Sequence, residues 1–407
     1  MAGADLALEH DKPIPLHPLV YVPDGDEVTI GRRDVDSYAV FPADGAEVVR
    51  RLETGASPGE VVRWYQAEYG ESLDIDHVLA ALVELDFVRD PSRPDGPSKP
   101  VRWQRLGATL FSVPAWLVYA GIAGWAVAVM IRSPDAVPTY HSIFFTDYYA
   151  VIELTLVATV IPLLLAHECF HALAARRLGV RTRLGIGRRL YTVVLETRMD
   201  GLVAVPRRQR YLPILAGVLF DGLAVAIFIV IADASRDPHG EFTLAGRLCL
   251  ALAFTTFLRI VWQTYLYLRT DLYALVVTVL GCVDLHATAR RLLANRWNRL
   301  LGRTHRVVDE STWHPVDRRV ARWYSWLVLV GYAASIGTLI LAVVPVFARL
   351  VAGLAGRLTG DQPTPAGLYV DAIVFLGLTM TQVGVSSWMA IREWRSRGQS
   401  RFQHVVA

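Results

Sequence analysis

The chain has 407 residues, of which 53% are hydrophobic, and its mean hydropathy is positive. This apolar share exceeds that of ordinary soluble domains and predicts an integral membrane protein, with the lipid bilayer as its surroundings. The formal net charge of +3 is too small and too dispersed for a nucleic-acid-binding surface, and Cys169, Cys249 and Cys282 all lie in or beside apolar stretches, which argues against an extracellular disulfide framework.

The N-terminal part has the pattern of a small α+β domain. Val20–Val22 and Val28–Ile30 are expected to form short strands around the turn Pro23–Asp26, and three short helices follow. The second helix begins with the capping sequence Ser57–Glu60, and Phe87–Val88 is a candidate returning strand. This order predicts a winged-helix-like domain over residues 1–90. No apolar signal-peptide core precedes it, so we expect it to remain in the cytoplasm.

A proline-rich linker over residues 91–104 leads to a membrane domain over residues 105–407. A helix needs about 20 apolar residues to cross a bilayer, and the membrane domain contains six stretches of that length. They are Leu106–Ile131, Ala150–Ala175, Tyr211–Ile231, Leu244–Leu268, Trp323–Val351 and Gly367–Ile391. A seventh run, Leu272–Val283, is too short to cross and is expected to be re-entrant or interfacial. The predicted fold class is therefore mainly α: a polytopic helical membrane protein with an α+β N-terminal domain.

The distribution of arginine predicts the orientation of the chain. Cytoplasmic loops are enriched in Lys and Arg, and arginines gather in residues 176–210, 290–322 and 392–401. The alternate loops are residues 133–147, 233–243 and 352–366. Their only Lys or Arg residues are Arg236 and Arg357. We therefore expect a multi-pass protein of the cell membrane with both termini in the cytoplasm.

The segment His167-Glu168-Cys169-Phe170-His171 lies inside the second apolar stretch. Residues four apart share one face of a helix, so the two histidines could present their imidazoles to a single Zn²⁺ ion. A bound zinc ion would acidify a water molecule, and Glu168 could accept its proton. Three ionisable groups in an apolar helix are costly unless they serve a site. The segment therefore predicts a zinc hydrolase.

A catalytic zinc ion needs a third protein ligand, and two aspartates compete for this position. Asp221 lies inside the third apolar stretch, where a simple packing role between helices is the favoured interpretation. Asp271 lies at the end of the fourth stretch, on the same side of the membrane as the end of the second. That depth favours Asp271 as the ligand.

These residues carry a resemblance that covers about Ala150 to Leu285. His167–His171, the segment Ala216–Gly217 and Asp271 recur in this order in the site-2 protease family of membrane zinc metalloproteases. The resemblance implies that the aspartate of an Asn-x-x-Pro-x-x-x-x-Asp-Gly pattern is the third ligand and that the asparagine assists in holding the substrate or the oxyanion. Here Gln263 replaces the asparagine, and Leu266 and Leu272 replace the proline and the glycine. We therefore expect His167, His171 and Asp271 to bind zinc, and Glu168 and Gln263 to act in catalysis.

The N-terminal pattern from Leu19 to Val88 resembles the peptide-binding module of the PqqD type. That resemblance implies that the domain binds the leader of a ribosomally made peptide by adding it as a strand to its sheet. A merely structural or regulatory winged helix is the alternative. Thr182–Ile186 and Leu190–Leu195 could also form a hairpin through Gly187-Arg188-Arg189, to which a substrate strand could pair, although an ordinary basic loop fits equally well.

The sequence thus predicts a membrane-embedded zinc metalloendopeptidase that matures a ribosomal peptide precursor recruited by its N-terminal domain. Cleavage of a membrane-anchored regulator is one alternative. A non-catalytic membrane receptor or immunity protein is the other. Glu153, Arg259, Asp371, Thr381 and Gln382 are further polar residues within the apolar stretches, and the sequence assigns them no partners.

Overall fold

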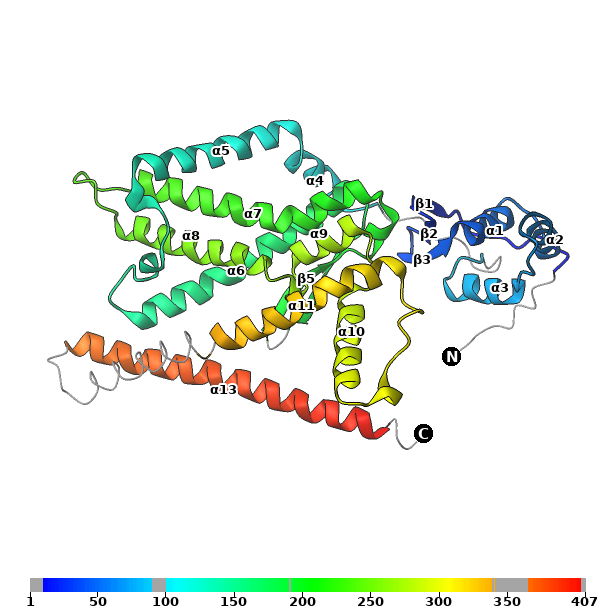
Figure 1. Ribbon diagram of the computed structural model, residues 1–407. Coiled ribbons are helices and arrows are strands. Elements are labelled where there is room, and N and C mark those ends of the chain that lie inside the picture. The colour runs from blue at the N-terminus through cyan, green and yellow to red at the C-terminus, as the bar shows by residue number, and fades with distance from the viewer. Residues whose placement is uncertain (1–9, 90–99, 190–191, 339, 341–364, 404–407) are drawn as a thin grey trace. The chain divides into compact units, whose positions relative to one another are not determined.

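The computed structural model describes residues 10–89, 100–189, 192–338, 340 and 365–403 (Figure 1). The described chain is mainly helical, as expected, with one three-stranded sheet near the N-terminus and one two-stranded sheet further along. It divides into two compact units, which are described separately. Most of the predicted linker, residues 90–99, lies outside the described residues.

The N-terminal sheet is an antiparallel meander of β1 (Val20–Asp24), β2 (Glu27–Arg32) and β3 (Ser37–Pro42). The two expected strands lie within β1 and β2, and they pair in the register Val22↔Thr29. The turn between them contains Gly25, whose positive φ of 69° suits glycine. Strand β3 was not expected from the sequence, because its side chains are half-buried or exposed and show no clear apolar alternation.

Three helices complete this domain: α1 (Ala43–Glu53), α2 (Pro58–Tyr69) and α3 (Ile75–Glu84). The capping box at Ser57 and Glu60 is present as predicted. The apolar core draws on both the sheet and the helices, and its members all lie between Ile14 and Phe87. Phe87–Val88 forms no returning strand, because Val88 makes only one isolated antiparallel bridge, to Leu16.

The N-terminal sheet also contacts a segment much later in the chain. The 3-10 helix η3 (Asp200–Ala204) lies against all three strands, and Gly201 sits close to the hydroxyl of Tyr38. Asp24 at the end of β1 forms ion pairs with Arg207 and Arg210. The domain therefore contacts both η3 and the first residues of α7.

Within the described residues, five helices are long and apolar enough to cross a membrane. They are α5 (Val113–Arg132), α6 (Tyr149–Arg177), α7 (Arg207–Ala234), α8 (Leu244–Gln263) and the first part of α13 (Ala366–Gln403). Side chains of α5, α7 and α8 share one apolar cluster, and α6 contacts α8 through another. The finding is compatible with a multi-pass membrane protein.

Two of the predicted spans have different limits in the structure. The first is interrupted after α4 (Gln104–Leu110), because Ser112 caps a new helix in which Pro114 occupies the first turn. The fourth ends at Gln263 and not at Leu268, because the chain turns through the short 3-10 helix η4 (Leu266–Leu268).

The fifth predicted span, Trp323–Val351, is described only in part. Its first residues belong to α11 (Pro315–Thr338), which is not among the five apolar helices, and residues 341–364 lie outside the described chain. The short run expected to be re-entrant or interfacial forms α9 (Asp271–Leu280). It is followed, at a bend of 88°, by α10 (Leu285–Leu300), and this pair could be a sixth, broken span or a re-entrant loop.

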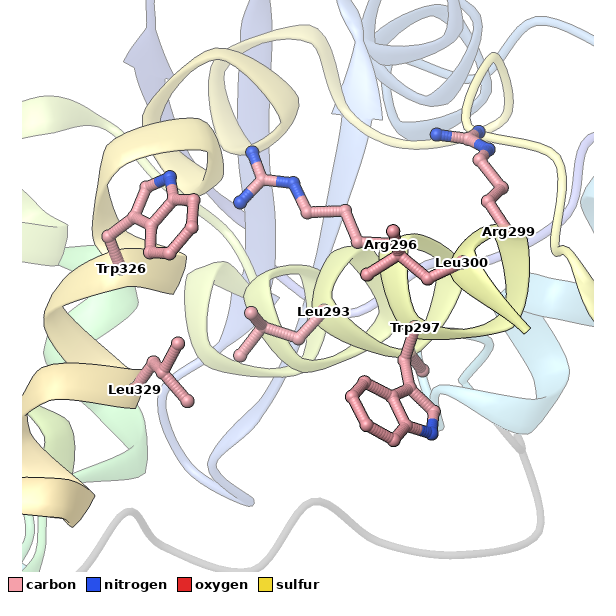
Figure 2. Close-up of a pocket in the computed structure, with 8 residues that line it drawn as sticks. Leu293, Arg296, Trp297, Arg299, Leu300, Trp326 and Leu329 are labelled. Atoms are coloured by element: carbon pink, nitrogen blue, oxygen red, sulfur yellow. The ribbon is translucent and has the colours of Figure 1, made fainter.

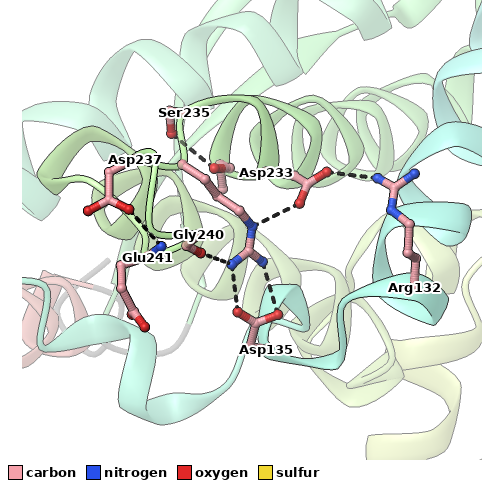
Figure 3. A network of polar contacts seen from close by, with 9 residues as sticks. Arg132, Asp135, Asp233, Ser235, Asp237, Gly240 and Glu241 are labelled. Atoms are coloured by element: carbon pink, nitrogen blue, oxygen red, sulfur yellow. Dashed lines mark hydrogen bonds and ion pairs between the residues drawn. The ribbon is translucent and has the colours of Figure 1, made fainter.

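A network of charged side chains connects the C-terminal ends of α5 and α7 and the loops that follow them (Figure 3). Arg236 donates to both carboxylate oxygens of Asp135, at 2.8 and 2.9 Å, and to Asp233 at 3.0 Å. Asp233 also accepts a hydrogen bond from Arg132 at 2.9 Å. The guanidinium of Arg236 lowers the pKa of Asp135 by hydrogen bonding. The cationic side chain of Arg236 in this arginine-poor loop is therefore matched by carboxylates.

The segment between α6 and α7 forms the expected hairpin. Its strands β4 (Arg183–Arg189) and β5 (Thr192–Arg198) pair with each other. The turn expected at Gly187-Arg188-Arg189 was wrong, because these residues belong to β4.

Candidate metal centre

Helix α6 positions the two histidines and the glutamate of the motif. His167 and His171 are four residues apart on this continuous helix and therefore lie on one face, as predicted. His167, Glu168 and His171 are all buried. The imidazoles of His167 and His171 are thus held side by side, and Glu168 directly follows His167 in the helix.

Asp271 reaches this face from the beginning of α9. After α8 the chain turns through η4 and Arg269, which adopts the left-handed φ of 58° that non-glycine residues rarely take. Thr270 then donates from Oγ1 to the carbonyl oxygen of Gln263 at 2.6 Å, which closes the turn. As the first residue of a helix, Asp271 lies near the positive end of the helix dipole, which stabilises an ionised carboxylate.

His167, His171 and Asp271 form one cluster. Each offers a ligand atom, and these atoms all lie within 4.8 Å of one another. His167 Nε2 and Asp271 Oδ2 are 3.2 Å apart. Two atoms that bind one zinc ion at about 2.0–2.1 Å in tetrahedral geometry would be about 3.3 Å apart. The cluster could therefore hold a metal ion without a large movement of this pair.

The opposite ring nitrogens of both histidines are held by acceptors. His167 Nδ1 lies 3.0 Å from Asp221 Oδ2, and His171 Nδ1 lies 2.7 Å from the carbonyl oxygen of Pro213. Each Nδ1 is thereby assigned as the donor, which leaves Nε2 with its lone pair for a metal. Such partners are typical of histidines that bind metals, because they fix both the tautomer and the ring orientation.

Asp221 is fully buried and has a second partner, Arg259 of α8, with which its other carboxylate oxygen forms an ion pair. The sequence analysis treated Asp221 as a rival ligand or a packing residue, and it gave Arg259 no partner. The structure links them in the series Arg259, Asp221, His167. Nothing in the sequence spacing indicates this link, because the three residues lie on three different helices.

Gln263 lies beside Asp271, but its side-chain oxygen is already engaged. Gln263 Oε1 accepts a hydrogen bond from the backbone N–H of Asp271 at 3.0 Å. The contact caps the first turn of α9 and holds Asp271 in place. Gln263, eight residues before Asp271, therefore holds the backbone of Asp271. The catalytic role expected for Gln263 stays a prediction.

Three of the remaining polar residues connect α13 to α6. Asp371 accepts hydrogen bonds from the backbone N–H groups of Tyr149 and Ala150, both at 2.9 Å, and caps the start of α6. Gln382 donates to Glu153 at 2.7 Å. These contacts fix the position of α6 without involving the metal cluster.

No model of a protein family, no curated protein and no solved structure matches this chain.

Proposed function

We propose that this protein is an integral membrane zinc metalloprotease of the site-2 protease type that matures a ribosomally made peptide precursor. The observation that supports the proposal is the cluster of the buried His167 and His171 with the partly buried Asp271, and Glu168 lies next to the first ligand. A structural zinc site is normally closed by four protein ligands, whereas a catalytic site keeps a position open. Three protein ligands beside a carboxylate fit the second kind.

When bound, zinc would act as a Lewis acid that lowers the pKa of a coordinated water molecule to about 7. Glu168 is the carboxylate best placed along the helix to accept the proton from that water and to pass it to the leaving amine. Asp221 and the carbonyl of Pro213 would hold the two imidazoles in the tautomer that binds metal. Gln263 would keep Asp271 in place through its backbone N–H.

The N-terminal domain is proposed to recruit the precursor in the manner of the PqqD type. Among the described residues, β3 pairs with β2 alone, so its other edge is a candidate surface for an added strand. The exposed Val40 lies on this strand. The contact of the sheet with η3 would keep a bound leader attached to the segment that enters α7.

The proposed orientation places both termini and the metal cluster toward the cytoplasm. His171 is six residues from the end of α6 at Arg177, where the arginine-rich segment begins. A precursor made on cytoplasmic ribosomes could then reach the site from the same side as the recruiting domain.

The proposal is tested with Glu168→Gln in the full-length protein. An amide cannot accept the proton of water, so cleavage should fall by about 10²- to 10⁴-fold while bound zinc stays stoichiometric. Glu153→Gln is the matched control, because it makes the same change on the same helix outside the cluster, and it should retain activity. The substrate to be tested is any short precursor peptide encoded beside the gene, and mass spectrometry measures its cleavage together with the metal content of each variant.

Three outcomes decide among the hypotheses. Undiminished turnover in Glu168→Gln would exclude the mechanism. Cleavage of a membrane-anchored regulator but not of a leader-bearing precursor would favour the regulated-proteolysis alternative. Leader binding without any cleavage in the wild-type chain would favour a receptor or immunity protein.

A further inference from the structure

Helices α10 and α11 enclose a pocket of about 880 Å³ that belongs to neither the metal cluster nor the N-terminal sheet. Figure 2 shows Leu293 of α10 directed toward Leu329 of α11, while the Trp297 ring projects from the lower side of α10. The two helices are joined by a common apolar core on their other faces. The pocket is therefore fixed between two packed helices.

The apolar groups at this pocket are unusually accessible. Trp297 is 62% exposed, Leu300 80% and Trp326 56%. Indole rings and leucines at the surface of a chain with five candidate membrane spans are typical of the boundary between headgroups and acyl chains. Water against such apolar walls is unfavourable, because apolar surface is stabilised when it is removed from water.

Positive charge is concentrated at the same place. Helix α10 contains four arginines and no acidic residue, and two of the arginines, Arg296 and Arg299, line the pocket. Arg296 donates to Ser325 at 3.0 Å and lies over the ring of Trp326. Arg299 is paired with Glu310 at 2.7 Å. Each guanidinium has five N–H donors, so these contacts still leave donors able to bind a phosphate oxygen.

We propose that this pocket binds one anionic phospholipid of the surrounding bilayer, with the phosphate at Arg296 and Arg299 and an acyl chain against Trp297, Leu300 and Leu329. The combination of an apolar wall and a cationic rim matches the two halves of such a molecule. Its volume lies within the range of about 300–1,000 Å³ that is typical of small-molecule sites. A peptide would match the apolar wall less well, because its backbone needs hydrogen-bond partners that leucine and tryptophan side chains scarcely provide.

The test uses the full-length protein in detergent, titrated with phosphatidylglycerol or phosphatidylcholine, with lipid adducts counted by native mass spectrometry. Phosphatidylglycerol should bind the wild type with 1:1 stoichiometry and at least about tenfold more tightly than phosphatidylcholine. Each arginine near a membrane surface contributes about fivefold to the binding of an anionic lipid, and Arg299 shares its charge with Glu310. The double variant Arg296→Gln/Arg299→Gln should therefore bind phosphatidylglycerol about tenfold more weakly.

The matched control is Arg290→Gln/Arg291→Gln, which removes the same charge from the same helix at residues that do not line the pocket. It should keep binding within about twofold of the wild type. Trp297→Ala provides a second variant, because the exposed ring has little part in the fold, and it should weaken binding severalfold. Circular dichroism and size-exclusion profiles check that each variant is folded.

Equal binding of the two lipids would overturn the proposal, as would equal losses in the two arginine double variants, which would indicate general attraction to the membrane surface. Displacement of the lipid by a stoichiometric amount of precursor peptide would assign the pocket to the peptide and also overturn it. None of these outcomes depends on cleavage, so the lipid site and the proposed protease activity fail or succeed separately.

Discussion

Two aspartates near His167, the buried Asp221 and the partly buried Asp271, have different contacts and therefore different expected roles. Asp271 faces His167 Nε2 and shares a cluster with His171. Asp221 faces the opposite nitrogen and is neutralised by Arg259. Only the first is positioned to bind a metal together with both histidines.

Metal analysis of single variants should separate these roles. Asp271→Ala should lose stoichiometric zinc, because two histidines alone make a weak site. Asp221→Asn should retain zinc but bind it about 10- to 100-fold more weakly, as expected when the partner of a ligating histidine is altered. Zinc retained in Asp271→Ala and lost in Asp221→Asn would reverse the assignment.

At this scale the sequence predicted the histidine spacing and the preference for Asp271, because both depend on helical periodicity and depth. It could not predict the contact between Asp221 and His167, which are 54 positions apart. Such a contact is determined by the rotation of α7 against α6, and a helix that is apolar on nearly all sides has no periodicity that fixes its rotation. For the same reason the partner of Arg259 was unpredictable.

Among the elements, β3 has a hydrogen-bond register that the hydrophobic pattern of the sequence does not reveal. Ala43 N donates to Asp26 O, which sets the positions of the hydrogen bonds between β2 and β3. Hydrogen-bonded pairs recur at every second position, so Val28↔Phe41 and Ile30↔Ala39 are hydrogen-bonded pairs and Thr29↔Val40 is not. The N–H of Val40 therefore points away from β2. Pro42 occupies an equivalent outward position, where the lack of an N–H costs no ladder bond.

Substitution of Val40 by proline should block strand addition selectively. It removes an outward N–H and leaves the ladder to β2 intact, so the affinity for the leader and the KM for precursor should worsen about tenfold while kcat at saturation is kept. Val40→Thr, which changes the side chain but keeps the N–H, is the matched control. Leader titration and steady-state cleavage measure both. Equal effects of the two substitutions would indicate side-chain recognition or a different edge.

The limits of the apolar helices were predictable only approximately. Composition located all five candidate spans, yet local turn chemistry decided where they stop. Ser112 and Pro114 divide the first predicted span, and the Gln263–Thr270 contact follows the early end of the fourth. Both signals are present in the sequence, but a hydropathy that is averaged over a window of residues does not reveal them.

At the scale of the whole molecule, recruitment and chemistry are expected to be separable. The core of the N-terminal domain is formed entirely by residues between Ile14 and Phe87, and no candidate metal ligand belongs to it. The domain nevertheless lies against η3. It would therefore act by holding the precursor near the membrane part, without contributing to hydrolysis.

A chain that begins at Val101 should bind zinc normally but process the full-length precursor poorly at low concentration. Tethering raises the local concentration of the cleavage site to about the millimolar range, so high substrate should restore most of the rate. The fragment ending at Pro100 should bind the leader without cutting it. Equal processing by the truncated and full-length chains at every concentration would contradict the recruiting role.

The ion pair between Asp221 and Arg259 also has a consequence for how the protein is made. An arginine costs about 2.5–3.5 kcal/mol at the centre of a membrane helix during insertion by the translocon and less toward the ends, and Arg259 lies four residues before the end of α8. Arg259 lies in α8, and its partner lies in α7, the helix synthesised just before it. We therefore expect α7 and α8 to leave the translocon together as a helical hairpin. Asp221, which orients His167 in the folded protein, would thus first neutralise Arg259 while α8 is inserted.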